Sequence, residues 1–116
     1  MGNSDQLDPD DAFDIVNEIE VDLVSDLGAT MTAVENERFE EANSCINGME
    51  GGADRIIEVG QESGEEHYVE FGKFVLDSCQ ELREAIQNED FEEMNRILNA
   101  LDQTGSQSFF ILGEND

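Results

Sequence analysis

Apolar residues recur every three or four positions along most of this chain, and this spacing constrains its fold more than any other feature. Between Pro9 and Leu27 they stand at Ala12, Ile15, Val16, Ile19, Leu23, Val24 and Leu27. Residues at such intervals share one face of an α-helix. The 116 residues include a single Pro, so helices can run with few breaks. We therefore expect an all-α fold, a small bundle of about four helices in one domain, residues 1–116.

Caps and glycines predict the ends of these helices. The first is expected from Pro9 to Leu27, between the cap Asp8 and the stop at Gly28. The second begins at a Thr32–Glu35 capping box and stops at Gly48, Gly51 and Gly52. A third segment, with a break or kink near Gly64, runs from Asp54 to Asn88. A short last helix runs from Asp90 to a stop at residues 104–106.

The sequence allows more than one structure for the C-terminal end of the chain and more than one role for three glycines. Residues 1–7 are expected to fray, and residues 106–116 to form a tail. Its apolar run Phe109–Leu112 is expected to pack back on the bundle, with an edge strand or a partner-docking segment as alternatives. Gly60, Gly64 and Gly72 either let another backbone approach closely or only weaken a helix by about 1 kcal/mol each. We recognise no internal repeat.

Charge excludes several classes of partner. The chain has 30 Asp and Glu against 5 Lys and Arg, a formal net charge of -25. Direct nucleic-acid binding and attachment to anionic membranes both need clustered Lys and Arg, so we expect neither. No stretch of about 18 apolar residues is present, so no membrane span is expected. The acidic N-terminus is unlike a signal peptide, which favours a cytoplasmic location, or the host cytoplasm for a viral protein.

Acids recur every fourth residue in the first predicted helix, at Asp10, Asp14, Glu18, Asp22 and Asp26. Like charges at this spacing destabilise a helix by about 0.2–0.5 kcal/mol per pair, and the first base of the chain is only Arg38. A solvated helix face is one explanation, and a partner-binding surface is the other. We predict that the surface also includes acids of the later helices: Glu37, Glu40, Glu41, Glu62, Glu66 and Glu70.

The charge of the chain is comparable with that of DNA. Duplex DNA carries one charge per about 1.7 Å, so 25 charges match roughly 12 base pairs. In charge and size the chain resembles the phage DNA-mimic proteins that block restriction and other defence enzymes. Leu7–Asp10, followed by Ala12, Asp14, Ile15 and Ile19, is also similar to the N-terminal helix of a small acidic bacterial family proposed to mimic double-stranded DNA. That family continues into a β-sheet, which this sequence does not indicate.

Other chemistry finds no support in the residue pattern. The acids near Asp8 lack the EF-hand spacing, and Gly64 stands where a di-iron bundle motif would need Glu before His67. Cys45 and Cys79 fall on apolar faces, which predicts buried free thiols, and His67 is expected to be partly exposed and unspecialised. No nucleophile motif or phosphate-binding loop is present. We expect neither an enzyme, nor a cofactor, nor a metal site.

Three functions remain compatible with this pattern. The first is a DNA-mimic inhibitor that occupies the basic cleft of a nucleic-acid-binding protein, such as a restriction or CRISPR effector. The second is an immunity or antitoxin protein for one basic nuclease. The third is a halophile adaptor domain, since the chain has a single Lys, Lys73, although its Ile, Asn and Cys content weighs mildly against this. Homodimerisation is left open.

Overall fold

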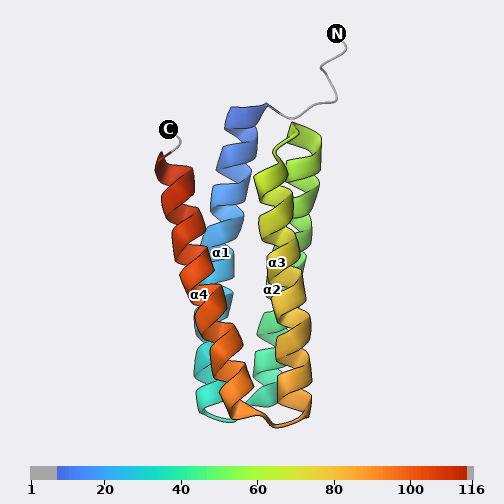
Figure 1. Ribbon diagram of the computed structural model, residues 1–116, viewed down its shortest axis with the longest axis vertical. Coiled ribbons are helices and arrows are strands. Elements are labelled where there is room, and N and C mark those ends of the chain that lie inside the picture. Colours follow the sequence, from blue (N-terminus) through green and yellow to red (C-terminus); the bar gives the residue numbers. More distant parts are fainter. Residues whose placement is uncertain (1–7, 115–116) are drawn as a thin grey trace.

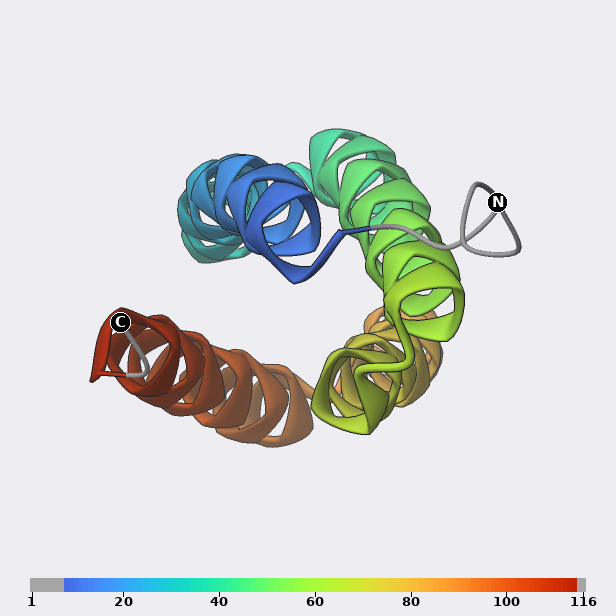
Figure 2. The same ribbon diagram turned by 90° about the horizontal axis from the view of Figure 1, so that it is seen from above.

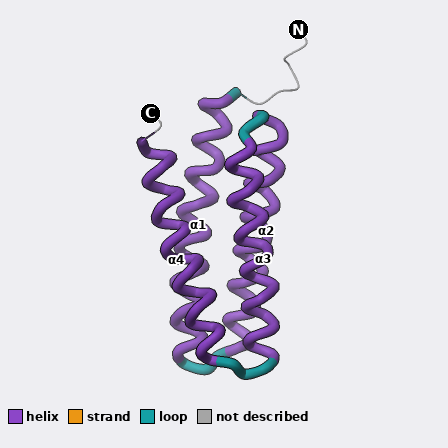
Figure 3. Tube along the Cα trace, viewed as in Figure 1, coloured by secondary structure: helices purple, strands orange, loops and turns teal. Residues whose placement is uncertain are grey.

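The computed structural model describes the backbone of residues 8–114 and the side chains of residues 8–103. Four α-helices follow one another: α1 (Pro9–Glu35), α2 (Phe39–Ser63), α3 (Glu66–Gln87) and α4 (Phe91–Glu114). Short loops join them at alternating ends of an elongated bundle (Figures 1 and 3). The all-α prediction is confirmed, and within residues 8–114 no strand occurs.

The predicted stop at Gly28 is wrong, because α1 continues for two further turns. Thr30, Ala33 and Val34 are buried and extend the apolar face of the helix past Gly28. Their burial outweighs the roughly 1 kcal/mol by which a glycine weakens a helix. The predicted capping box at Thr32 does not form either, since the Thr32 hydroxyl donates to the Gly28 carbonyl 3.1 Å away inside α1.

The glycines in the middle of α2 allow close packing and do not end the helix. A Cβ atom at Gly52 would lie 3.1 Å from Leu23 Cδ2 of α1, and one at Gly48 would lie 2.7 Å from Asp26 Oδ2. The expected loop at Gly48–Gly52 and the helix start at Asp54 are therefore wrong. Sequence alone cannot separate these two roles, because a glycine that ends a helix and one that admits a neighbour look the same.

Of the two alternatives for Gly60, Gly64 and Gly72, close approach of a neighbouring backbone holds for Gly60 and Gly72, between α2 and α3. A Cβ at Gly60 would lie 2.9 Å from the Glu65 carbonyl oxygen, and one at Gly72 would lie 2.8 Å from the Ala53 carbonyl oxygen. Gly64 has a different role, since its φ of 76° places it in the left-handed region at the turn between the two helices. The predicted break near Gly64 is thus confirmed as the α2–α3 connection.

The α1–α2 and α3–α4 loops have the same backbone conformation. At the end of α1, Arg38 N–H donates to the Ala33 carbonyl, and Glu37 has a φ of 57°. At the end of α3, Asp90 N–H donates to the Ala85 carbonyl, and Glu89 has a φ of 56°. Both are Schellman motifs in which a glutamate, rather than the usual glycine, takes the left-handed position.

These matching loops identify an internal repeat that the sequence reading missed. Residues 33–50 (AVENERFEEANSCINGME) align without gaps on residues 85–102 (AIQNEDFEEMNRILNALD), with eight identical residues and most of the others similar. The equivalent Phe39 and Phe91 lie against each other, with ring centroids 5.9 Å apart. Such contact between equivalent residues is expected near a two-fold axis, so the bundle is built from two related helical hairpins.

The bundle is not equally closed on all sides. Viewed from above, the helices follow an arc that stays open between α1 and the C-terminal half of α4 (Figure 2). The core lies inside the arc, and its fully buried side chains include Ile46, Met49, Ile56, Leu82 and Leu98. The predicted stop of α4 at residues 104–106 is wrong, since the helix continues to Glu114, and an edge strand at Phe109–Leu112 is excluded. The side chains of this run lie outside the described part.

Candidate functional site

The acids of the α1 series lie on the surface, but they do not share one face. Successive members are four residues apart, so each is turned by about 40° from the one before. Asp10, Asp14, Glu18 and Asp22 are exposed on the side of α1 away from the core. Asp26, about 160° round the helix from Asp10, is only half-exposed. The series therefore winds across the outer surface of α1 and turns in towards α2.

Asp26 packs in the groove between α1 and α2. Its carboxylate lies over Gly48, whose lack of a side chain makes room for it. Burial, and secondarily the neighbouring Asp22, raise the pKa of Asp26 above its usual value. The exposed Arg55 of α2 also lines this groove. Asp26 is therefore the member of the series least available to a partner.

The acids predicted on the later helices gather at opposite ends of the bundle. Glu37, Glu40 and Glu41 are exposed around the α1–α2 loop, whereas Glu62, Glu66 and Glu70 are exposed around the α2–α3 turn. The second group lies at the same end of the bundle as the start of α1 (Figure 1). The eleven candidates thus form an extended acidic surface along the bundle, and no compact site.

Most bases of the chain are paired with its own acids. Arg83 of α3 reaches Glu50 of α2 at 2.7 Å, Arg96 of α4 reaches Glu81 of α3 at 3.7 Å, and Arg38 lies 3.8 Å from Glu41. Helix α1 contains eight acids and no base. Helix α1 therefore lies in the longest stretch of the described chain that contains no Lys or Arg.

The charge density of the bundle approaches that of DNA. The described residues keep 28 of the 30 acids, since Asp5 and Asp116 lie outside them, and all five bases, a net charge of -23. The longest axis measures 53 Å, which gives one net charge per about 2.3 Å. Duplex DNA has one per about 1.7 Å. The bundle therefore presents about three quarters of the charge of a duplex of equal length.

A further acid, Glu20, was missed by the sequence reading and is buried. It is 2% exposed, and neither carboxylate oxygen has a hydrogen-bond partner among the described residues. Burial raises the pKa of Glu20 from 4.5 to about 7. The sequence held a signal, because Glu20 continues the buried positions Val16, Leu23 and Leu27 at helical spacing.

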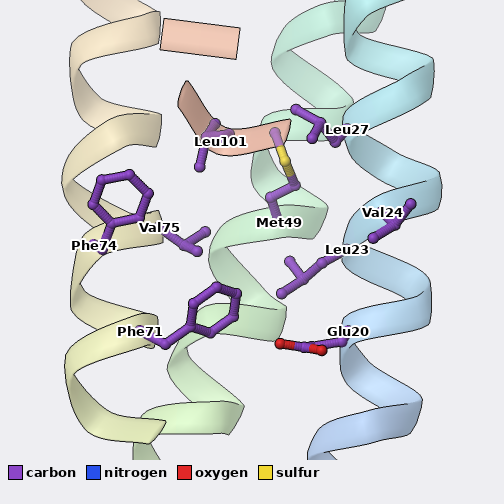
Figure 4. Close-up of a pocket in the computed structure, with 9 residues that line it drawn as sticks. All are labelled: Glu20, Leu23, Val24, Leu27, Met49, Phe71, Phe74, Val75 and Leu101. Atoms are coloured by element: carbon purple, nitrogen blue, oxygen red, sulfur yellow. The ribbon is translucent and has the colours of Figure 1, made fainter. Parts of the chain in front are cut away.

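Glu20 lines an otherwise apolar pocket inside the arc, where α4 begins to diverge from α1. The described side chains around it come from all four helices: Leu23, Val24, Leu27, Met49, Phe71, Phe74, Val75 and Leu101. Its cavity measures about 30 Å³, enough for about two water molecules. Figure 4 shows the Glu20 carboxylate pointing across the space between the helices towards the ring of Phe71. Val24 and Phe74, 51% and 36% exposed, lie nearest to solvent.

The remaining candidates for chemistry are two free cysteines and one histidine. Cys79 is a buried free thiol, and burial, reinforced by Glu50, raises its pKa to about 12. Cys45 is free but only half-buried, so the prediction of two buried thiols is confirmed for Cys79 alone. The His67 side chain is 50% exposed, as expected, and lies beside Glu65 and the ring of Tyr68.

Among the side chains of residues 8–103, no three His, Cys, Asp or Glu are grouped so as to hold a metal ion. No helix in the described part is both long and apolar enough to cross a membrane. Comparison with protein families, with curated proteins and with solved structures gives no match for this chain.

Proposed function

We propose that this protein is an acidic mimic of duplex nucleic acid, which occupies the basic cleft of a nucleic-acid-binding protein. The observation that carries the proposal is the outer surface of α1, where Asp10, Asp14, Glu18 and Asp22 are exposed along about 18 Å of a helix that contains no base. A helix of 27 residues is about 40 Å long. Its acids are attached to a packed bundle, so the surface meets a partner already in position.

Energetics support a binding role for this surface. Like charges along α1 destabilise the helix, and the dipole of α1 opposes acids near its C-terminal end. A basic cleft would neutralise these charges and remove that repulsion on binding. An inhibitor of this kind needs neither catalytic residues nor a cofactor, since it acts by occupying a site.

Competition against DNA tests the proposal. A labelled DNA duplex is bound to each of a panel of DNA-binding proteins with basic clefts, and the acidic protein is titrated in at 50 mM salt. We expect displacement of the duplex from at least one panel member. Affinity for that member is expected to fall by more than about tenfold between 50 and 200 mM salt. Absence of displacement from every member would contradict the proposal.

Matched variants separate the α1 surface from general negative charge. The triple variant D14N/E18Q/D22N removes three exposed charges from α1, and D77N/E84Q/D102N removes three exposed charges from α3 and α4. A mimic that binds through α1 should lose much more affinity with the first triple than with the second. Equal losses would show that only net charge matters.

Thermal unfolding at low salt distinguishes the halophile alternative. A halophile domain depends on molar salt for its fold, whereas a mimic has to be folded where it binds. Circular dichroism at 50 mM salt should therefore show a helical protein with a cooperative unfolding transition. A chain that becomes helical only in molar salt would favour the halophile explanation.

A further inference from the structure

The internal repeat pairs Glu20 with an equivalent residue of the second hairpin. Helices α1 and α3 end in the same Schellman loop at equivalent positions 52 residues apart, so Glu20 of α1 corresponds to Gly72 of α3. In the second hairpin, Gly72 lets α3 pack directly against the backbone of α2 at Ala53. In the first hairpin, the equivalent neighbour of α1 is α4. At this position α1 carries the side chain of Glu20, which points across the space inside the arc towards Phe71 (Figure 4).

The consequence is a pocket with one charged group inside apolar walls. An ionised carboxylate that is 2% exposed is costly when, as for Glu20, no donor among the described residues replaces its hydration. The other eight lining residues are apolar. A ligand that satisfies both features needs a positive group to pair with Glu20 and a hydrocarbon part to contact the walls.

The dimensions of the pocket narrow the class of ligand. A cavity of about 30 Å³ admits an ammonium group, which is about as large as a water molecule. A guanidinium or quaternary ammonium group is larger than this cavity. The half-exposed side chains of Val24 and Phe74 provide an apolar exit, along which an unbranched hydrocarbon stem can lie.

We propose that the Glu20 pocket binds a primary alkylammonium ion, with its ammonium group paired to the Glu20 carboxylate and its unbranched stem between Val24 and Phe74. This chemistry belongs both to the lysine side chain of a protein and to a free aliphatic amine. The proposal is independent of the α1 surface, since it concerns a buried site on the inner side of the arc.

The test is a titration at pH 8, where Glu20 is ionised, with n-butylammonium as the probe. Binding is followed by NMR shift changes of the amides of Leu23, Val24 and Val75, which line the pocket. We expect E20Q to weaken binding by at least tenfold. We expect E18Q to change it less than twofold, since it removes the same charge from the exposed side of α1. Far-UV circular dichroism checks that both variants are folded.

Matched ligands define the chemistry and its source. n-Butanol has the same stem without the charge, and butyltrimethylammonium has the charge on a larger head, so both should bind at least tenfold more weakly. Nα-acetyl-lysine N-methylamide tests the lysine side chain: binding as tight as that of butylammonium assigns the site to a polypeptide partner, and binding of the free amine alone assigns it to a small amine.

Three results would overturn the proposal. Equal binding to the E18Q and E20Q variants would show diffuse attraction of cations to an acidic protein. Equal binding of butanol would show an apolar cavity in which the carboxylate has no part. Absence of shifts at the lining residues up to the highest probe concentration would show that the cavity holds water or is covered by the chain itself. None of these results bears on competition with DNA.

Discussion

Replacement of Glu20 by Gln should stabilise the protein, and the gain should depend on pH. Burial raises the pKa of Glu20 from 4.5 to about 7, and one pKa unit corresponds to about 1.36 kcal/mol. The folded state therefore holds a proton on Glu20 between pH 4.5 and 7 that the unfolded state has lost. The wild-type protein loses stability as the pH rises through this window, by about 3 kcal/mol in total.

The size of this effect follows from the two pKa values at each pH. At pH 5 the Glu20 carboxyl is mostly ionised in the unfolded state and protonated in the folded state. The free energy of unfolding is then only about 1 kcal/mol below its value at low pH. At pH 8 the Glu20 carboxyl is ionised in both states, and this loss of unfolding free energy reaches about 3 kcal/mol. Glutamine cannot ionise, so the advantage of E20Q over the wild type should grow by about 2 kcal/mol between pH 5 and pH 8.

Urea unfolding followed by far-UV circular dichroism measures this difference. For a domain of this size, this difference of about 2 kcal/mol means that the urea midpoint of E20Q, relative to the wild type, rises by roughly 1–2 M between pH 5 and pH 8. The exposed variant E18Q is the control, because it relieves the same overall repulsion on the same helix without touching a buried group. An E20Q advantage of equal size at pH 5 and pH 8 would refute the reasoning.

Four further outcomes are expected. Gly72→Ala should destabilise the protein by about 2 kcal/mol or more, because the new Cβ would lie 2.8 Å from a backbone carbonyl. Gly28→Ala, with open space around it, should instead stabilise it by up to about 1 kcal/mol in the same urea assay. In the native protein at pH 8, Cys79 should not react with a thiol reagent while Cys45 does, as peptide mapping after labelling will show. Asp90→Ala should lower the thermal midpoint at a cost of about 1 kcal/mol, since the Asp90 carboxylate accepts the Glu93 N–H at the start of α4. No loss on this change would mean that the cap contributes nothing.

The acidic candidates show how far surface residues can be predicted. Ten of the eleven acids are exposed, because residues outside the apolar stripe of an amphipathic helix face the solvent. Asp26 is the exception, since it drifts about 160° round α1 from Asp10 and meets α2. Which acids lie near one another could not be predicted, because their positions depend on where each helix ends. Gly28 and the glycines of residues 48–52 resemble helix ends in the sequence but lie inside α1 and α2.

The apolar periodicity of the chain specified four helices and most of the core, because burial follows from which residues share a helix face. The repeat of residues 33–50 in residues 85–102 was present in the sequence as well, but its meaning as two related hairpins became clear from the matching loops. The roles of the glycines and of Glu20 depended on which helices face them. Gly72 admits the backbone of α2 because its side chain is a hydrogen atom, whereas the equivalent Glu20 places a buried carboxylate inside the arc.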